Sequence, residues 1–261
     1  MITLYEHPLS AYAMKVKIAL NEKGLEYRTA IPEGMAKGQA GGEFLSANPR
    51  AEVPALIDGD FAIFDSTVML EYLDEKWPSP PLLPASPRDR ARVRMIEDVM
   101  DTQYEPNNWG SFEVLRYRRA TGALAEKLLA FGKRNIGQLQ GWLDAQLEDR
   151  PWFNGNAFGW GDLSVIPYLN RSAGYGYLPE KGSRLADWFE RANRRETVAK
   201  VRTQMQAAID ALPDLGELLR KGEVVRQYRD HRLEWMIGAG GLSVVTEGIE
   251  KGTIRFSRTP D

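Results

Sequence analysis

Five prolines fall within residues 78–87, in the stretch PSPPLLPASP. Proline has a fixed φ and no backbone N–H, so it is excluded from helix interiors and from central strands. This segment therefore separates a part in which short strands and helices alternate from a part that is helical nearly throughout. We predict a first domain at 1–78, a linker at 79–87, a helical domain at 88–236 and an extended tail at 237–261.

The first part has the pattern of a mixed sheet. Apolar and polar residues alternate in ITLYE at the N-terminus, a helical stretch begins near Ala11, and EYRTAI at 26–31 predicts a second strand. Two later apolar runs are joined through Asp58 and Gly59, a strong hairpin signal, and the helix after them ends before Pro78. A crossover joins parallel strands and a hairpin joins antiparallel ones, so we predict an α/β unit with a mixed four-stranded sheet.

The second part is dominated by helical periodicity. Leu139, Leu143 and Leu147 recur at four-residue intervals on one face of a helix. The stretch GDLSVIPYLNR is apolar nearly all round, which predicts a central buried helix that is kinked or restarted at Pro167. The glycine-rich tail from Gly238 contains two short β-like runs, and we expect it to lie extended over an otherwise all-α domain.

Charge and composition exclude several kinds of partner. The 261 residues include 34 Lys and Arg against 36 Asp and Glu, so no overall basic field exists to hold nucleic acid or an anionic membrane. No apolar run approaches the roughly 18 residues of a spanning helix, and the start of the chain lacks a secretory pattern, so we expect a cytoplasmic protein. With no cysteine and two histidines, neither a metal site nor a protein thiol is expected. A small-molecule partner is favoured.

Four motifs, in order, resemble the cytosolic glutathione S-transferase superfamily over roughly residues 1–220. LYEHPLSAYAMKVKIALNEKGLEY resembles the first strand, turn and helix of its thioredoxin-like domain, and FLSANPRAEVPALIDGD resembles the segment that carries its Val-Pro motif. FDSTVMLEYLDEKWP resembles its acidic-Ser motif, and FGWGDLSVIPYLNR the start of its buried helix. The resemblance implies a thioredoxin-like domain that binds glutathione as cosubstrate, an all-α substrate domain, and a homodimer.

Ser10 matches the catalytic serine of the serine-type classes. By this resemblance, its hydroxyl donates a hydrogen bond to the sulfur of glutathione and so favours the thiolate. The helix that begins near Ala11 adds positive partial charge at the same place. Two alternatives stay open: Ser10 acts only as a helix cap, or Tyr5 is the catalytic group, as in the tyrosine-type classes.

The resemblance also assigns the residues that hold glutathione. Val53 and Pro54 match the cis-proline motif, whose backbone groups pair with the cysteinyl part. Asp65 and Ser66 match the acidic-Ser pair at the γ-glutamyl end, where a helix N-terminus attracts the carboxylate and Asp65 pairs the α-ammonium. Lys37 is the nearest cation for the glycine carboxylate.

Three positions depart from the family pattern. Asp162 matches the residue that caps the buried helix, but the usual Ser or Thr three residues earlier is Gly159, so the capping box is incomplete. Ala51 stands where glycine is frequent, and Glu52 where Gln or Lys is commoner. These two substitutions indicate a remodelled glutathione site.

The acceptor site of the family lies between its two domains. By resemblance, aromatic and apolar residues line it here: Leu9, Tyr12, Tyr104, Trp109, Phe112 and Trp235. We therefore expect attack of glutathione thiolate on a hydrophobic, aromatic electrophile, by conjugation, dehalogenation or ether cleavage. The stretches FGWGD and IRFS are similar to bacterial glutathione-dependent enzymes that process lignin-derived aromatics, which suggests a lyase or etherase. The alternative is a non-catalytic binding or regulatory protein with the same fold.

Overall fold

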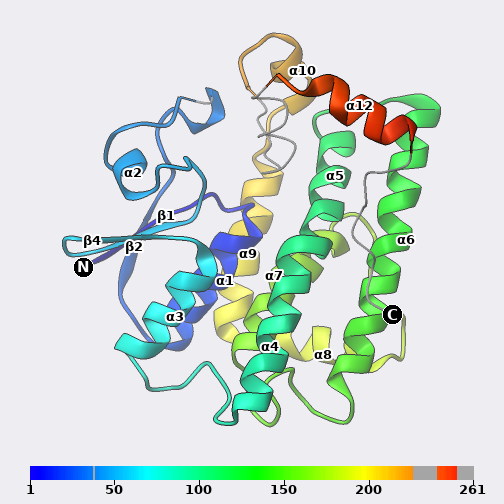
Figure 1. Ribbon diagram of the computed structural model, residues 1–261. Helices are drawn as coiled ribbons and strands as arrows, with labels where there is room; N and C mark the ends of the chain where they lie inside the picture. Colours follow the sequence, from blue (N-terminus) through cyan, green and yellow to red (C-terminus); the bar gives the residue numbers. More distant parts are fainter. Residues whose placement is uncertain (38, 226–239, 252–261) are drawn as a thin grey trace.

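The computed structural model describes residues 1–37, 39–225 and 240–251 (Figure 1). The chain forms an α/β unit built on a four-stranded sheet and, beside it, a larger unit made of helices. The predicted fold class is therefore confirmed. Within the described ranges, no helix is both long and apolar enough to cross a membrane.

The sheet has the strand order β2-β1-β3-β4. Its strands are β1 (Ile2–Tyr5), β2 (Tyr27–Ala30), β3 (Ala55–Asp58) and β4 (Phe61–Phe64). Strand β1 is parallel to β2 and antiparallel to β3, where Tyr5 lies opposite Ala55. The β3–β4 hairpin turns at Gly59, whose φ of +67° lies in the left-handed region that glycine adopts readily. The predicted hairpin is confirmed.

Four helical segments belong to the α/β unit. They are α1 (Ala11–Glu22), the 3-10 turn η1 (Met35–Lys37), α2 (Gly42–Ala47) and α3 (Ser66–Lys76). Helix α1 packs against α3 of its own unit and against α7 and α9 of the helical unit. It is consequently buried on nearly every side, and even Lys15 and Lys17 have almost no exposed surface. A lysine buried in this way needs carboxylate partners, and those of Lys15 come from the helical unit.

The helical unit is arranged around one buried helix. Its segments are α4 (Pro87–Val99), the π-helical turn η2 (Met100–Tyr104), α5 (Glu105–Leu115), α6 (Gly122–Leu147), α7 (Trp160–Ala173), α8 (Arg184–Asn193), α9 (Glu196–Asp210) and α10 (Leu215–Arg220). All residues of α7 from Trp160 to Ser172 are buried, as predicted. The helix continues through Pro167, so the predicted alternative of a restart there is wrong.

The first turn of α7 explains why position 159 is a glycine. Asp162 accepts a hydrogen bond from the N–H of Gly159 at 3.1 Å, which is half of a capping box. The missing side chain is replaced by Asn154, whose Oδ1 accepts from the N–H of Gly161 at 3.0 Å. A Cβ at Gly159 would lie 2.0 Å from the amide nitrogen of Asn154 and 2.4 Å from the carbonyl oxygen of Leu82. The cap that is incomplete in the sequence is therefore completed by a residue outside the motif.

The predicted extended tail is wrong where the structure describes it. Residues Leu242–Glu250 form helix α12, which lies near the ends of α5 and α6 (Figure 1). Val245 and Ile249 are β-branched and favour strands, but together with Leu242 they also follow the three-to-four-residue spacing of a helix. The other β-like run, near the C-terminus, lies outside the described residues.

Candidate functional site

Ser10 is the N-cap of α1. Its Oγ accepts a hydrogen bond from the N–H of Ala13 at 3.2 Å, and its own N–H donates to the carbonyl of His7 at 2.8 Å. The imidazole Nδ1 of His7 accepts from the N–H of Leu9 at 3.2 Å, so the turn before the helix is ordered by its own side chains. A hydroxyl has one donor and two acceptor sites, so capping uses an acceptor and leaves the proton of Ser10 available for donation.

The phenol of Tyr5 is directed to α2. Its hydroxyl donates to Oε2 of Glu43 at 2.5 Å, and its ring packs 5.5 Å from that of Phe44, centre to centre. The hydrogen bond to Glu43 raises the pKa of Tyr5, and burial raises it further. The hydroxyl proton of Tyr5 is therefore already donated to Glu43, so it is not available to stabilise a thiolate.

The loop that leads into β3 has the geometry of the Val-Pro motif. The peptide bond between Val53 and Pro54 is cis, as predicted. Asn48 holds the loop, since its Nδ2 donates to the carbonyl of Glu52 at 2.6 Å. Ala51 has a φ of +56°, in the left-handed region that favours glycine. This backbone conformation gives a physical reason for the glycine that the family pattern has there.

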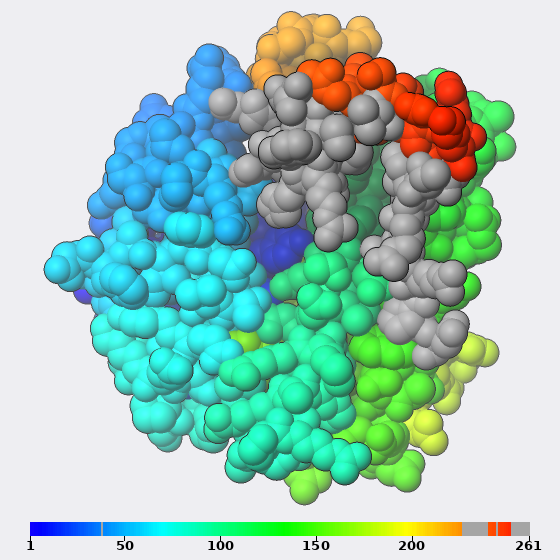
Figure 2. Space-filling model, viewed as in Figure 1, coloured from blue at the N-terminus to red at the C-terminus, as the bar shows by residue number. Residues whose placement is uncertain are grey.

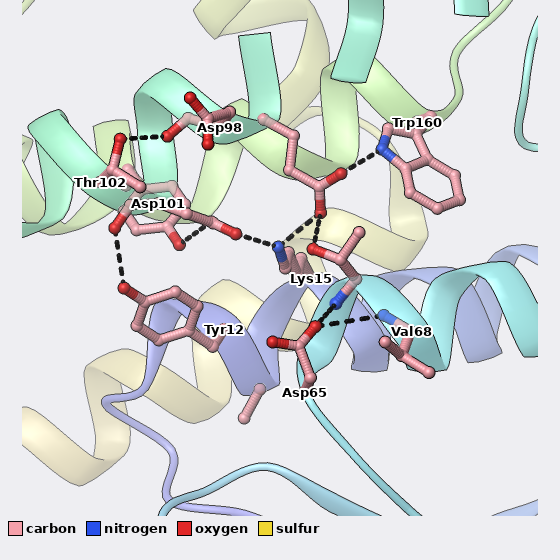
Figure 3. Close-up of polar contacts among 12 residues, drawn as sticks. Tyr12, Lys15, Asp65, Val68, Asp98, Asp101, Thr102 and Trp160 are labelled. Carbon is pink, nitrogen blue, oxygen red and sulfur yellow. Dashed lines mark hydrogen bonds and ion pairs between the residues drawn. The ribbon is translucent and has the colours of Figure 1, made fainter. Parts of the chain in front are cut away.

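Asp65 is the N-cap of α3. Its Oδ1 accepts from the N–H groups of Thr67 and Val68, at 3.0 and 3.2 Å, while Ser66 beside it is buried (Figure 3). The carboxylate thus lies at the positive end of a helix, where it can also meet an ammonium. By contrast, Lys37 is exposed on η1 and forms no ion pair with a described residue.

A buried charge cluster joins the two units, between α1 and the segment formed by α4 and η2 (Figure 3). The ammonium of Lys15 lies 2.6 Å from Oε1 of Glu97 and 2.7 Å from Oδ2 of Asp101. Trp160 donates to the other oxygen of Glu97, and Tyr168 to the other oxygen of Asp101, both at 2.5 Å. Every carboxylate oxygen of the cluster therefore has a donor, which is the condition for burying charge at tolerable cost.

The ionisation of the cluster depends on burial and on the two carboxylates. Burial raises the pKa of Asp101 more than the ammonium of Lys15 lowers it, and Glu97 raises it further. Burial lowers the pKa of Lys15, but the attraction of Asp101 and Glu97 outweighs it and the net shift is upward. Lys15 is therefore positively charged and forms ion pairs with both carboxylates.

The aromatic side of the site begins at Tyr12, two residues after Ser10. Its hydroxyl donates to the backbone carbonyl of Asp101 at 2.9 Å, and its ring meets that of Tyr168 edge to face at 6.0 Å. Burial, with the charges of Glu105 and Asp101, raises the pKa of Tyr12, so the phenol stays protonated. Figure 2 shows a hollow between the two units, in which atoms of the N-terminal part of the chain are visible in deep blue.

The predicted acceptor residues differ in how deeply they are buried. Leu9, Trp109 and Phe112 are half-buried. Tyr104 has no exposed surface; its hydroxyl lies 2.8 Å from that of Ser172 inside the helical unit. Tyr104 is thus a core residue rather than a pocket residue, because α7 covers it. Trp235 lies outside the described residues.

Comparison with known proteins agrees with this geometry. Residues 4–81 match the family described as "Glutathione S-transferase, N-terminal domain" and residues 124–191 match "Glutathione S-transferase, C-terminal domain". The chain belongs to the cytosolic glutathione S-transferase superfamily.

Alignments with individual relatives cover most of this chain. It is 30% identical to the stringent starvation protein A homolog of Coxiella burnetii over 185 residues, which are 70% of this chain and 82% of that protein. It is 28% identical to glutathione S-transferase U25 of Arabidopsis thaliana over 217 residues, 80% and 92% of the two chains. Rice GST1, solved in complex with glutathione, superposes with a TM-score of 0.69 at 26% identity, covering 86% and 98%.

The sequence analysis of this superfamily member did not predict the charge cluster. Lys15 lies in a helix that is buried on nearly every side, which the sequence analysis did not predict. Glu97 and Asp101 are four residues apart, the spacing that places two side chains on one helical face, and that was the available signal. No group of three or more His, Cys, Asp or Glu with the arrangement of a metal site occurs in the described part of the chain.

Proposed function

We propose that the protein is a serine-type glutathione S-transferase in which Ser10 donates a hydrogen bond to the sulfur of bound glutathione. The observation that carries the proposal is the hydrogen bond from Ala13 to Ser10 at the start of α1. It fixes the hydroxyl at the positive end of a helix and leaves its proton free to donate. The thiol then releases its proton to solvent more readily, because the thiolate is stabilised.

Glutathione would lie along the N-terminal ends of α1 and α3. In this arrangement, the backbone of Val53 and Pro54 pairs with its cysteinyl part, and Asp65 and Ser66 bind its γ-glutamyl end. Lys37 is our candidate for the glycine carboxylate; its exposed position on η1 leaves it able to reach a ligand. Rice GST1 supports glutathione as the ligand, since a similar fold was solved with glutathione bound.

The acceptor is proposed to lie against Leu9, Tyr12, Trp109 and Phe112, with Trp235 as a further candidate. Aromatic side chains on both units favour a hydrophobic, aromatic electrophile. Conjugation, dehalogenation and ether cleavage all begin with attack by the same thiolate, so any of the three fits this arrangement. We further propose a cytoplasmic homodimer, as the superfamily implies.

Titration of the thiol of bound glutathione, followed by its ultraviolet absorbance, tests the role of Ser10. A hydrogen bond to a charged group contributes about 1.5–3 kcal/mol, so Ser10→Ala should raise the pKa of the thiol by about one to two pH units. Tyr5→Phe should leave it unchanged. Because Ser10→Ala also removes a cap, Ser10→Gly is the second variant, since glycine caps nearly as well. An unchanged thiol pKa in both Ser10 variants, or a shift in Tyr5→Phe, would contradict the proposal.

A second candidate function is a non-catalytic binding protein. It is favoured by the similarity to the Coxiella burnetii protein, which is named as a stringent starvation protein homolog and not as a transferase. Retention on immobilised glutathione together with no turnover of a broad panel of electrophiles would select this function. Turnover that depends on Ser10 would exclude it.

A further inference from the structure

The buried cations of the described residues fall into two kinds. Lys15, Lys17 and Lys23 each form an ion pair with a carboxylate, at 2.6, 2.7 and 2.8 Å. Arg171 on α7 is also buried, with 9% of its surface exposed, but it forms no ion pair with any residue that the structure describes. Buried charges in proteins are nearly always paired, so a positioned guanidinium without a carboxylate indicates an anion supplied from outside.

Arg171 is nevertheless held in one place. Its guanidinium lies 5.0 Å above the ring of Phe112 and its Nη2 donates to the hydroxyl of Tyr175 at 2.9 Å. Within the described ranges, this is the single hydrogen bond of its side chain. An arginine fork has five N–H donors, so several remain for a ligand, in a geometry suited to two parallel bonds with a carboxylate.

The position of Arg171 connects it to the acceptor site. Phe112, over which it lies, is one of the residues proposed to line that site. Tyr168, one turn earlier on α7, packs against Tyr12 at the other side of the same region. Arg171 is thus one helical turn along α7 from Tyr168, whose ring contacts that of Tyr12 in the helix that Ser10 caps.

Tyr175, which Arg171 contacts, lies near charges of both signs. Burial has the largest effect on the pKa of Tyr175 and raises it, the guanidiniums of Arg171 and Arg116 lower it, and Glu105 and Tyr177 raise it. Glu105 is half-buried in the first turn of α5 and does not form an ion pair with Arg171. A neutral aromatic acceptor would leave the cation without a counter-charge, whereas an acceptor with a carboxylate would supply one.

We propose that Arg171 binds a carboxylate of the acceptor substrate, so that the electrophile is an aromatic acid. The proposal rests on the proposed transferase function for the location of the site. Arg171 is a specificity-determining residue here: it selects an anionic acceptor over a neutral one of the same shape. Loss of a charge-assisted hydrogen bond in a partly dry site lowers affinity by about tenfold or more.

Equilibrium binding of two probes tests this inference without turnover. The probes are 4-chloro-3-nitrobenzoate and 4-chloro-3-nitrobenzamide, which share shape and leaving group and differ in charge. In the full chain, calorimetry should show the benzoate bound at least about tenfold more tightly than the benzamide. Arg171→Met should reduce the ratio to about one with the benzamide affinity unchanged, and Arg171→Lys, which keeps the charge and loses the fork, should give an intermediate ratio.

The matched control is Arg191→Met. Arg191 on α8 also lies 5.0 Å from an aromatic ring, that of Trp152, and donates to a backbone carbonyl, but α8 carries none of the proposed site residues. Its variant should keep the wild-type ratio, as should Ser10→Ala, in which transferase chemistry is impaired. A wild-type ratio near one, or an unchanged ratio in both Arg171 variants, would overturn the proposal. If Ser10→Ala left the pKa of the glutathione thiol unchanged, the proposed function would be overturned, but the inference about Arg171 would not.

Discussion

Lys15 and Thr67 donate to the same carboxylate oxygen, Oε1 of Glu97, from 2.6 and 2.9 Å (Figure 3). Lys15 is in the helix that Ser10 caps, and Thr67 is in the first turn of the helix that Asp65 caps. One oxygen of the helical unit is therefore hydrogen-bonded to both helices whose N-terminal ends form the proposed glutathione site. The distance between the two ends of that site depends on a residue that would not touch the ligand.

Thr67→Val should weaken glutathione binding without changing the fold. Valine keeps the shape of threonine and removes the hydroxyl that ties α3 to Glu97, so the first turn of α3 loses one of its restraints. We expect glutathione affinity to fall about threefold to tenfold, which corresponds to about 1 kcal/mol of lost positioning. Thr67→Ser should restore most of it.

Thr197→Val is the matched control for that experiment. Thr197 also donates its hydroxyl to a carboxylate across the boundary of the two units, that of Glu22, but at the opposite end of α1 from Ser10. Calorimetry should therefore find wild-type glutathione affinity in Thr197→Val. Equal losses in Thr67→Val and Thr197→Val would show that general loosening of the boundary is responsible.

Lys15→Met should be strongly destabilising. Removing the cation leaves Glu97 and Asp101 buried together without a counter-charge, and breaking a buried pair in this way costs about 3–5 kcal/mol. Urea denaturation measures the loss in the free energy of unfolding. Adding Asp101→Asn should recover part of the lost free energy of unfolding, because it removes one of the two carboxylates left without a counter-charge. Arg194→Met, which breaks an exposed pair with Glu190, should leave the unfolding midpoint where it was.

The stability of the protein should depend on pH through Asp101. Burial raises its folded-state pKa above the unfolded value of about 4, so the folded protein binds more protons than the unfolded chain between those two values. The contribution of Asp101 to the free energy of unfolding therefore falls as the pH rises through that window. Each pKa unit corresponds to about 1.4 kcal/mol.

The Asp101→Asn variant isolates this effect. An asparagine accepts from Lys15 through its carbonyl and donates its amide to the Tyr168 hydroxyl, which can reverse its bond. In urea denaturation series from pH 4.5 to 8, the variant should gain stability relative to the wild type as the pH rises. A difference that is constant over this range would show that Asp101 does not titrate there.

The order of strands and helices followed from local signals, because turns and helix ends are encoded within a few residues. Gly59 gave the hairpin and Ser10 the start of α1. The charge cluster did not follow, since Lys15 and Asp101 are 86 residues apart and nothing local distinguishes a buried lysine from an exposed one. The prediction for the tail was wrong because Val245 and Ile249 were weighed by their strand preference, whereas their spacing with Leu242 also fits the helix that the structure has there. Turns and helix ends can therefore be predicted from the sequence, whereas ion pairs between distant residues can be identified only in the folded structure.

At the cap of α7, the family pattern and the structure predict opposite effects of Gly159→Ser on stability. Restoring the usual residue with Gly159→Ser would be expected to stabilise the helix by about 1 kcal/mol if the cap were missing. In the structure, its Cβ would lie 2.0 Å from the Asn154 amide and 2.4 Å from the carbonyl of Leu82. The backbone carbonyl cannot move away easily, so we expect destabilisation of about 1–3 kcal/mol, the usual cost of overpacking.

Thermal and urea unfolding of three variants separates steric conflict from loss of glycine flexibility. Gly137→Ala is the control, because Gly137 lies in the exposed middle of α6 with nothing within 4 Å of a Cβ, and it should stabilise by up to about 1 kcal/mol. Gly159→Ser should destabilise. Combining it with Asn154→Ala removes the nearer clash and lets the serine cap the helix, so the double variant should be more stable than Gly159→Ser alone. If Gly159→Ser proved more stable than the wild type, Asn154 would not be the cap of α7.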